Sequence, residues 1–174
     1  MAIRLEEWSE DDHLSVIRWN VLFPTFLTRA FLSSLRKTSL SSPVLVVFNS
    51  SFSPEFAVPN FPLYPATDAF VQRLPSCLSI NEKIVPGESK IEFMHLHVGP
   101  VHSNTTPKPT DSSSQTSDDY AAHIVKAFGS GREDVVPLAT DKIQLTITRN
   151  LPGFVQQEML KKEAGKRFTS SKEE

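Results

Sequence analysis

Three of the chain's five histidines lie close together, in the stretch EFMHLHVGPVH from Glu92 to His102. Side chains alternate between the two faces of a β-strand, so His95 and His97 share one face if this stretch is a strand. Their positions would be about 7 Å apart along the strand, a separation that two imidazoles can bridge to one metal ion. The spacing therefore permits a zinc or iron site.

A catalytic metal needs at least one further protein ligand. The available side chains are His102, Asp118, Asp119 and His123. His102 follows the Gly99-Pro100 turn directly, and the predicted metal set is His95, His97 and His102. The alternative without metal is a pair of histidines at a strand end that donate hydrogen bonds to loop carbonyls or face solvent.

Hydrophobic periodicity predicts the elements that would position these histidines. A helix is expected over 10–36, kinked or broken at Pro24, and a second over 118–128, ended by Gly129. A last helix should run from about Asn150 to Lys162. Strands are predicted at 43–48, 90–98 and 142–149. Prolines predict mostly irregular chain from 49 to 86, with a short helix beginning near Thr67.

These elements predict an α+β fold, with a small mixed sheet packed by the N-terminal, middle and C-terminal helices. A parallel pairing of 90–98 with 142–149 across helix 118–128 is permitted. We expect one globular domain over 1–165, a mobile Ser/Thr/Pro-rich loop at 101–118, and a frayed charged tail at 166–174.

Two enzyme families share parts of the histidine pattern. EFMHLH, followed by PLA at 137–139, a strand, Arg149 and a helix, resembles the second half of the bacterial and fungal luciferase-like domain family. Cupins also carry His-x-His on a strand, followed four or five residues later by a Glu. This chain has Pro100 to Ser103 there and lacks that Glu. Either likeness implies a small metal-dependent or acid-base enzyme built on His95 and His97.

The order of elements gives a third likeness. A helix, the VLVVF strand, the FMHLHV strand, the IQLTIT strand and a closing helix follow the same order as in the core of rhabdovirus matrix proteins, to which the chain is similar. This likeness implies a structural or accessory role in a virus, exerted through assembly with other proteins.

Composition removes several classes of function. A net charge of −2 gives no basic surface for a phosphate backbone, so nucleic acid is not expected as the main partner. Apolar runs reach only about five residues, against the roughly 20 that a membrane-spanning helix needs. The acidic N-terminus lacks a secretory pattern, and Cys77 has no second cysteine to pair with. We therefore expect an intracellular, cytoplasmic protein, with peripheral membrane contact left open.

No complete catalytic constellation can be assembled from the sequence alone. The leading interpretation is therefore a non-catalytic interaction or assembly protein without a cofactor, of the matrix-like or accessory viral kind, which binds a protein partner or itself. The alternative is the small enzyme described above, with zinc or iron at His95 and His97.

Overall fold

The computed structural model describes residues 4–55, 62–84, 89–99, 101–102 and 115–170. Three parallel strands form the main sheet in the order β1-β2-β5. They are β1 (Val44–Ser51), β2 (Ile91–Val98) and β5 (Asp134–Val135). Strands β1 and β2 pair along their whole length, whereas β5 adds only two residue pairs, His95 with Asp134 and Leu96 with Val135.

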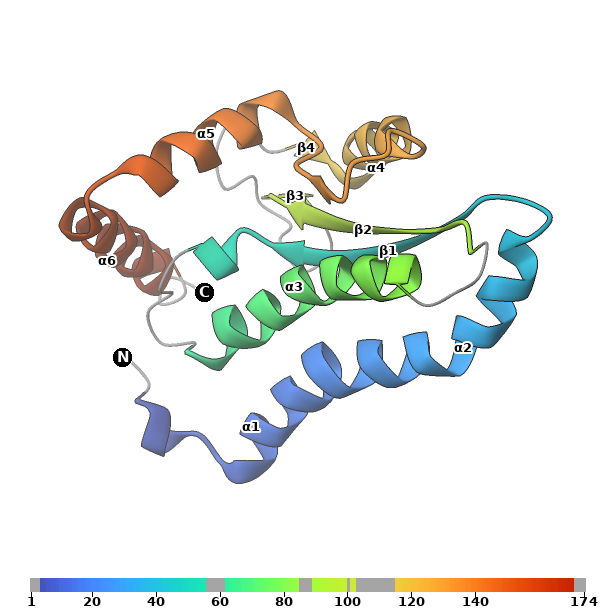
Figure 1. The fold of residues 1–174 in the computed structure, drawn as a ribbon. Coiled ribbons are helices and arrows are strands. Elements are labelled where there is room, and N and C mark those ends of the chain that lie inside the picture. Colours follow the sequence, from blue (N-terminus) through green and yellow to red (C-terminus); the bar gives the residue numbers. More distant parts are fainter. Residues whose placement is uncertain (1–3, 56–61, 85–88, 100, 103–114, 171–174) are drawn as a thin grey trace.

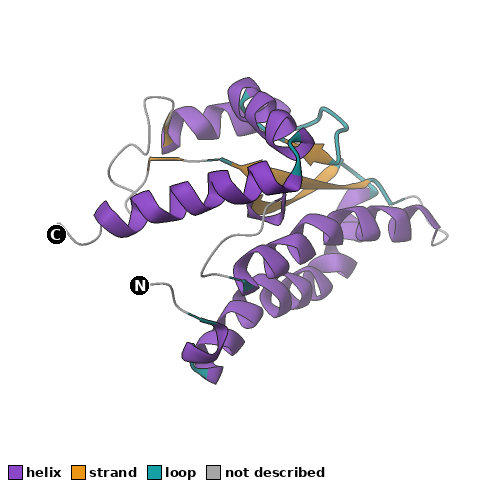
Figure 2. Ribbon diagram, turned by 90° about the vertical axis from the view of Figure 1, so that its left-hand side faces the viewer, coloured by secondary structure: helices purple, strands orange, loops and turns teal. Residues whose placement is uncertain are grey.

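Helices cover both faces of this sheet, as Figures 1 and 2 show. One face packs against α2 (Phe23–Ser39) and α3 (Leu63–Ile84), and the other against α4 (Ser117–Ala127). The chain begins with α1 (Glu10–Ile17) and ends with α5 (Ala139–Asn150) and α6 (Gly153–Ser170). A parallel sheet with helices on both faces is an α/β arrangement. The prediction of helices packed on a small sheet is therefore confirmed. The predicted α+β class and the mixed strand directions are wrong, since the main sheet is parallel.

The alternation along β2 builds both halves of the core. Ile91 and Phe93 join Phe48 and Val71 in the cluster under α2 and α3. The opposite face carries Met94 and Leu96, which pack with Ala127 and Val135 under α4. The predicted strands at 43–48 and 90–98 and the helix at 118–128 are confirmed, because their hydrophobic patterns match the faces that they bury.

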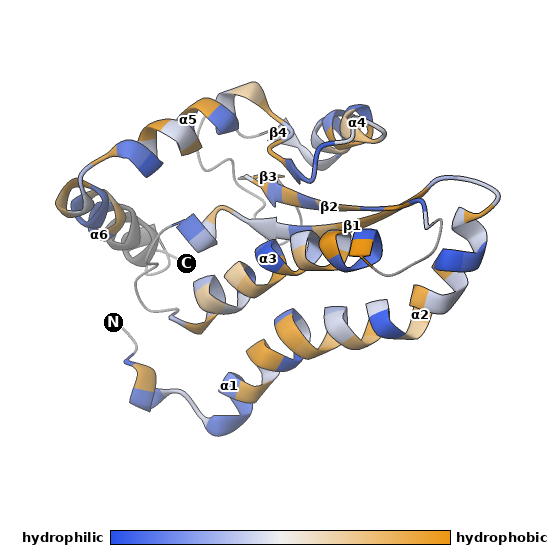
Figure 3. Ribbon diagram, in the orientation of Figure 1, coloured by the Kyte–Doolittle hydropathy of each residue, from blue (hydrophilic) through white to orange (hydrophobic). Residues whose placement is uncertain are grey.

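The N-terminal helix continues past Pro24 instead of breaking there. A π-helical turn, Arg18–Leu22, joins α1 to α2, and Pro24 then lies in the first turn of α2. In the π-helical turn the Phe23 N–H bonds to the Arg18 carbonyl five residues earlier, so the irregularity in hydrogen bonding lies directly before Pro24. Apolar residues, orange in Figure 3, recur along this long helix. Its exposed large hydrophobic side chains include Trp19, Phe23, Phe26 and Phe31, each more than half exposed.

Residues 63–84 are helical, so the prediction of mostly irregular chain over 49–86 is wrong for this part. Pro65 lies in the first turn of α3, where it costs little, and only Pro75 interrupts the helix interior. Leu74, Leu78 and Val71 pack α3 against the sheet, and this burial outweighs the hydrogen bond lost at Pro75. Residues 56–61 and 85–88 lie outside the described part.

The predicted strand at 142–149 is also wrong, because these residues form most of α5. Ile143 and Ile147 are exposed, and Leu145 is buried. Alternating Ile and Thr residues imitate a strand, yet the Thr146 and Thr148 hydroxyls donate to the carbonyls four residues earlier. This back-bonding satisfies the hydroxyls within a helix, which explains why two-residue alternation misleads here.

The expected loop at 101–118 is described only at its two ends. Strands β3 (Val101–His102) and β4 (Gln115–Thr116) pair in parallel as a separate two-stranded sheet. Residues 103–114, where most of the loop was predicted, lie outside the described residues. At the C-terminus α6 extends to Ser170, beyond the predicted Lys162, and into the tail expected to fray. The single domain over 1–165 stays a prediction. Of the described helices, none has the length and apolarity needed to cross a membrane.

Candidate functional site

Polar side chains gather where the parallel strands end. Since β1 and β2 run in parallel, Ser51 at the end of β1 lies opposite Val98 at the end of β2. The first turns of α3 begin beside the same end. In open parallel sheets ligands bind outside the carboxyl ends of the strands, so we take this end as the candidate site.

The predicted histidine pair is present and buried. His95 is 1% exposed and His97 is 0% exposed, and their ring centroids lie 4.2 Å apart with the rings edge to face. The third member of the cluster is Asp134 on β5. Its Oδ1 atom lies 2.7 Å from Nδ1 of His95 and 2.8 Å from Nε2 of His97. One carboxylate oxygen thus contacts both imidazoles.

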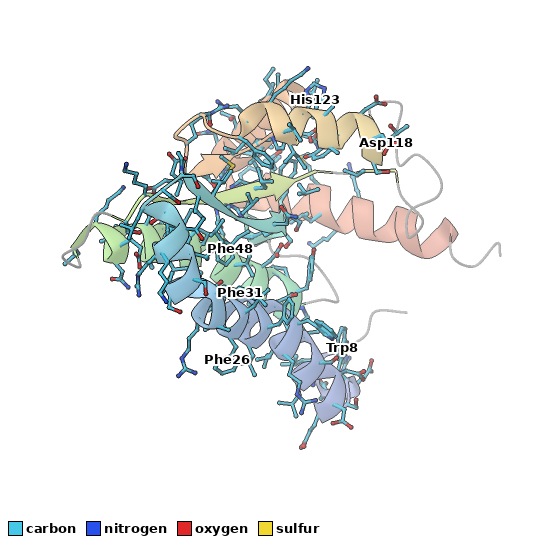
Figure 4. All side chains as sticks on the ribbon, turned by 90° about the vertical axis from the view of Figure 1, so that its right-hand side faces the viewer. Trp8, Phe26, Phe31, Phe48, Asp118 and His123 are labelled. Carbon is cyan, nitrogen blue, oxygen red and sulfur yellow. The ribbon has the colours of Figure 1, made fainter. Side chains whose placement is uncertain are left out.

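Of the four candidates for a third ligand, the three whose side chains are described, Asp118, Asp119 and His123, do not belong to this cluster. His95, His97 and Asp134 form the described group that could hold a metal ion. Asp118 and His123 lie on α4, where Figure 4 labels them, and Asp119 hydrogen-bonds Thr116 at the N-terminus of α4. His102 lies on β3, and its side chain is outside the described part.

The charge state of Asp134 follows from its two imidazole neighbours. Burial alone would raise the pKa of this carboxyl, but hydrogen bonds from His95 and His97 outweigh burial and lower the pKa far below its usual range. Asp134 is therefore ionised at neutral pH. On the far side of His95, Nε2 lies 2.6 Å from the Ser50 hydroxyl oxygen. Ser50, His95 and Asp134 thus form one continuous chain of hydrogen bonds from β1 to β5.

A second network joins the end of β1 to α3. Asp68, 5% exposed, accepts three hydrogen bonds at Oδ2 from the Ser51 N–H (3.0 Å), the Ser51 hydroxyl (2.7 Å) and the Ser53 hydroxyl (2.8 Å). The Ser51 hydroxyl also accepts from the Ser53 N–H at 3.0 Å. These bonds fix the direction of the Ser51 hydroxyl. Oδ1 of Asp68 accepts no hydrogen bond within the described residues.

The turn that carries Tyr64 is anchored from the opposite side. The Thr67 hydroxyl donates to the carbonyls of Leu63 and Tyr64, and it accepts from the amide of Asn20 at 2.9 Å. Asn20 belongs to the π-helical turn before α2. Tyr64 itself is 42% exposed. The first turn of α3 is therefore held by Asn20 and by Asp68, while the Tyr64 side chain stays accessible.

Two further polar contacts border this end of the sheet. Arg149 of α5 forms a bidentate ion pair with Glu55, which also accepts from Gln72 at 2.9 Å. Burial would raise the pKa of Glu55, but the bond from Arg149 lowers it below its ordinary value. The Gly99 N–H donates to the Tyr120 hydroxyl at 2.8 Å. Burial, helped by the nearby Asp141 carboxylate, raises the pKa of Tyr120 to about 12, so its phenol stays protonated.

This arrangement can perform acid-base chemistry on an oxygen-bearing ligand. Tyr64 offers an accessible phenol, and Ser51 offers an ordered hydroxyl with one acceptor position left. Asp68 offers a carboxylate oxygen for a ligand hydroxyl. The cluster of His95, His97 and Asp134 offers metal-ligating atoms.

Solved structures share this topology, whereas neither the models of known protein families nor the curated protein sequences match the chain. A 7β-hydroxysteroid dehydrogenase superposes with a TM-score of 0.70 at 16% identity over 92% of this chain. A short-chain dehydrogenase from Streptomyces avermitilis gives 0.62 at 19% over 98%. An alcohol dehydrogenase from Thermococcus sibiricus, complexed with 5-hydroxy-NADP, gives 0.59 at 22% over 78%.

The chain has the Rossmann-like fold of short-chain dehydrogenases. It spans 62%, 65% and 57% of the length of these three structures, respectively. The interpretation as a non-catalytic, matrix-like or accessory viral protein is wrong, because the solved structures with this fold are enzymes of the dehydrogenase class. The expectation of a protein without a cofactor is also not supported, since the Thermococcus enzyme was solved with a dinucleotide.

Sequence reasoning missed four residues of this site: Ser51, Tyr64, Asp68 and Asp134. Ser51 and Tyr64 lie in a stretch interpreted as irregular, and the predicted short helix began only near Thr67, so the four-residue spacing from Tyr64 to Asp68 on one helix face was not recognised. Asp134 follows the Gly129–Arg132 turn, and two strand residues give too short a pattern to detect. The signal available was the parallel order of β1 and β2, which places their carboxyl ends together.

Proposed function

We propose that the chain is the substrate-facing part of an oxidoreductase that interconverts an alcohol and a carbonyl compound with a nicotinamide dinucleotide. The observation that carries this proposal is the contact of Ser51 with Asp68 at the carboxyl end of a parallel sheet whose topology matches dehydrogenases, with Tyr64 one helical turn before Asp68 on α3. A steroid or another secondary alcohol is the substrate class, by analogy with the solved 7β-hydroxysteroid and alcohol dehydrogenases.

The described residues fit the sugar side of such a dinucleotide. Carboxylates accept hydrogen bonds from ribose hydroxyls in dinucleotide sites. Oδ1 of Asp68 is available for such a bond, since its three described donors all bind Oδ2. Glu55, Asp68 and Asp134 bring negative charge to this end, which suits hydroxyl groups better than phosphates. When bound, the nicotinamide supplies the hydride transfer.

Tyr64 is the residue that we propose to exchange the proton with the substrate oxygen. It is accessible, whereas Tyr120 is buried, 2% exposed, and its hydroxyl is engaged by the Gly99 N–H. Asn20 and Thr67 anchor the backbone turn that carries Tyr64. Ser51 would accept the substrate hydroxyl with its remaining lone pair, and Asp68 would keep Ser51 in that direction.

A turnover assay tests this proposal. The purified protein is incubated with NAD⁺ or NADP⁺ and a panel of secondary alcohols that includes hydroxysteroids, and the reduced nicotinamide is followed by absorbance. We expect turnover with at least one pair, retained in Glu82→Gln at the opposite end of the sheet. Absence of turnover throughout the panel, in folded protein, would overturn the proposal.

We also propose that the chain binds a protein partner or a second copy of itself. The exposed apolar side of α1 and α2 presents Trp19, Phe23, Phe26 and Phe31, and apolar patches of this kind mark contact surfaces. A cytoplasmic location is proposed from Cys77, whose thiol is free and exposed, as suits a reducing compartment.

A further inference from the structure

The joint between β2 and β5 is held by few backbone contacts. Two residue pairs and the bond from the His95 N–H to the Glu133 carbonyl, 2.8 Å, connect the strands. The side chains of His95, His97 and Asp134 span the same joint. A short strand attached in this way depends on its side chains, so the joint is where a bound ion would add most to stability.

We propose that His95, His97 and Asp134 form a site for a divalent transition-metal ion, with zinc as the ion of choice. Each residue offers one ligand atom, and these three atoms lie within 4.8 Å of one another. Zinc binds imidazole nitrogen at about 2.0–2.1 Å and carboxylate oxygen at about 2.0–2.2 Å, which places two tetrahedral ligand atoms roughly 3.3 Å apart. The nitrogen-to-oxygen distances are 2.7 and 2.8 Å, so the side chains need to separate by only about half an ångström to admit the ion.

Hydrogen bonds alone do not complete this cluster. His97 is 0% exposed, yet its Nδ1 atom has no hydrogen-bond partner within the described residues. A buried polar atom without a partner costs free energy, so one nitrogen of this ring is available for another ligand.

The surroundings of His95 match those of a metal-bound histidine. Metal-bound histidines donate their second ring nitrogen to a neighbouring oxygen, which fixes the tautomer. Here Nε2 of His95 lies 2.6 Å from the Ser50 hydroxyl oxygen, so a proton on Nε2 leaves Nδ1 free to bind the ion beside Asp134.

Access and coordination number also suit an ion. The Asp134 side chain is 57% exposed, which gives the ion a path from solvent to the two buried rings. Three protein ligands leave an open position for water or a fourth ligand. The metal site is independent of the proposed dehydrogenase activity.

Metal titration of the whole chain tests the site. The protein is stripped with a chelator and titrated with Zn²⁺ by calorimetry and with Co²⁺ by visible absorption. We expect one ion per chain in the wild type and in the control His123→Ala, and an affinity at least about 100-fold lower in His97→Gln and Asp134→Asn.

Thermal melting of each variant separates loss of the site from loss of the fold. Variants that melt cooperatively without metal but gain no thermal stability on addition of Zn²⁺ support the site. No stoichiometric uptake by the wild type, or equal uptake by wild type and Asp134→Asn, overturns it. Neither result depends on turnover, so failure here is distinguishable from failure of the proposed activity.

Discussion

The two ends of the parallel sheet carry different kinds of polar structure. At the carboxyl end, buried hydroxyls, imidazoles and carboxylates from β1, β2, α3 and β5 contact one another in two networks. At the amino end, one bidentate ion pair joins Arg36 of α2 to Glu82 of α3, with bonds of 2.6 and 3.0 Å. A hollow of about 450 Å³ beside it is lined by residues that include Pro43, Glu82 and Lys90.

We interpret this difference as one between residues that we propose to serve chemistry and residues that hold helices together. In the pair at the amino end, each charged group has its partner. The carboxyl end instead contains an unpartnered imidazole nitrogen at His97 and an accessible phenol at Tyr64. Polar groups that are buried but incompletely satisfied reduce stability, and sites that bind ligands commonly bear this cost. Variants at the two ends should therefore separate activity from stability.

The largest expected effect is on turnover by Tyr64→Phe. Loss of a positioned proton donor commonly lowers rates by about 10²–10⁴-fold, so kcat should fall by that factor. Because Tyr64 is 42% exposed, the melting temperature should change little. Steady-state kinetics and thermal melting measure the two effects. Wild-type kcat in this variant would remove Tyr64 from the proposed mechanism.

Asp68→Ala should give the largest change in stability. It leaves the Ser51 N–H and two hydroxyls without their acceptor in a buried environment, so the free energy of unfolding should fall by about 3 kcal/mol. Urea denaturation measures this change. Asp68→Asn, which keeps one carbonyl acceptor, should lose less. A loss below about 1 kcal/mol in Asp68→Ala would mean that the network around Ser51 does not hold the end of β1.

Glu82→Gln tests the amino end and should reduce stability without reducing turnover. The hydrogen bond from Arg36 lowers the pKa of Glu82 despite its burial. A lowered folded-state pKa contributes stability above the unfolded-state value of about 4.3, and this contribution is lost as pH falls through the folded-state pKa. The variant should be about 1–2 kcal/mol less stable than wild type at neutral pH.

The same comparison at acid pH checks the sign of that effect. Urea denaturation below the ordinary pKa of Glu should bring wild type and Glu82→Gln progressively closer, since both then lack the ionised carboxylate. A difference that grows toward acid pH would contradict the lowered pKa of Glu82.

Asn20→Ala should give the smallest effects, a small loss of stability and a small loss of turnover. It removes one hydrogen bond to Thr67, at 2.9 Å, for which we expect a loss of about 1 kcal/mol. Because Thr67 also binds the carbonyl of Tyr64, kcat should fall more than KM changes. Asn49→Ala, at an exposed position on β1, is the matched control. Equal kinetics in both variants would separate Asn20 from the site.

Local sequence patterns predicted the elements in which buried side chains recur at the regular spacing of a strand or helix. The alternation of Ile91, Phe93, His95 and His97 placed both histidines on one face of β2, and the strand is confirmed. At 143–148 the same kind of alternation failed, since threonine hydroxyls bond back to carbonyls within α5. Two-residue periodicity cannot distinguish these cases without the tertiary contacts that decide them.

The candidate site was predictable only where its residues are close in sequence. His95 and His97 are separated by one residue and were identified. Asp134 lies 39 positions from His95 and reaches it only through the parallel pairing of β5 with β2. The partners of Ser51 are likewise set by the packing of α3 on β1. Long-range contacts of this kind follow from topology, which the local patterns did not fix.

Hydrogen–deuterium exchange with and without NADP⁺ tests the central claim most directly, namely that the carboxyl end of the sheet holds the dinucleotide. Binding should slow exchange in 50–55, in the first turns of α3 over 64–68, and in 97–99, while the segments around Arg36 and Glu82 at the amino end exchange as before. Protection confined to the amino end, or no protection by NADP⁺ and none by NAD⁺ at concentrations that saturate dehydrogenases, would contradict the account.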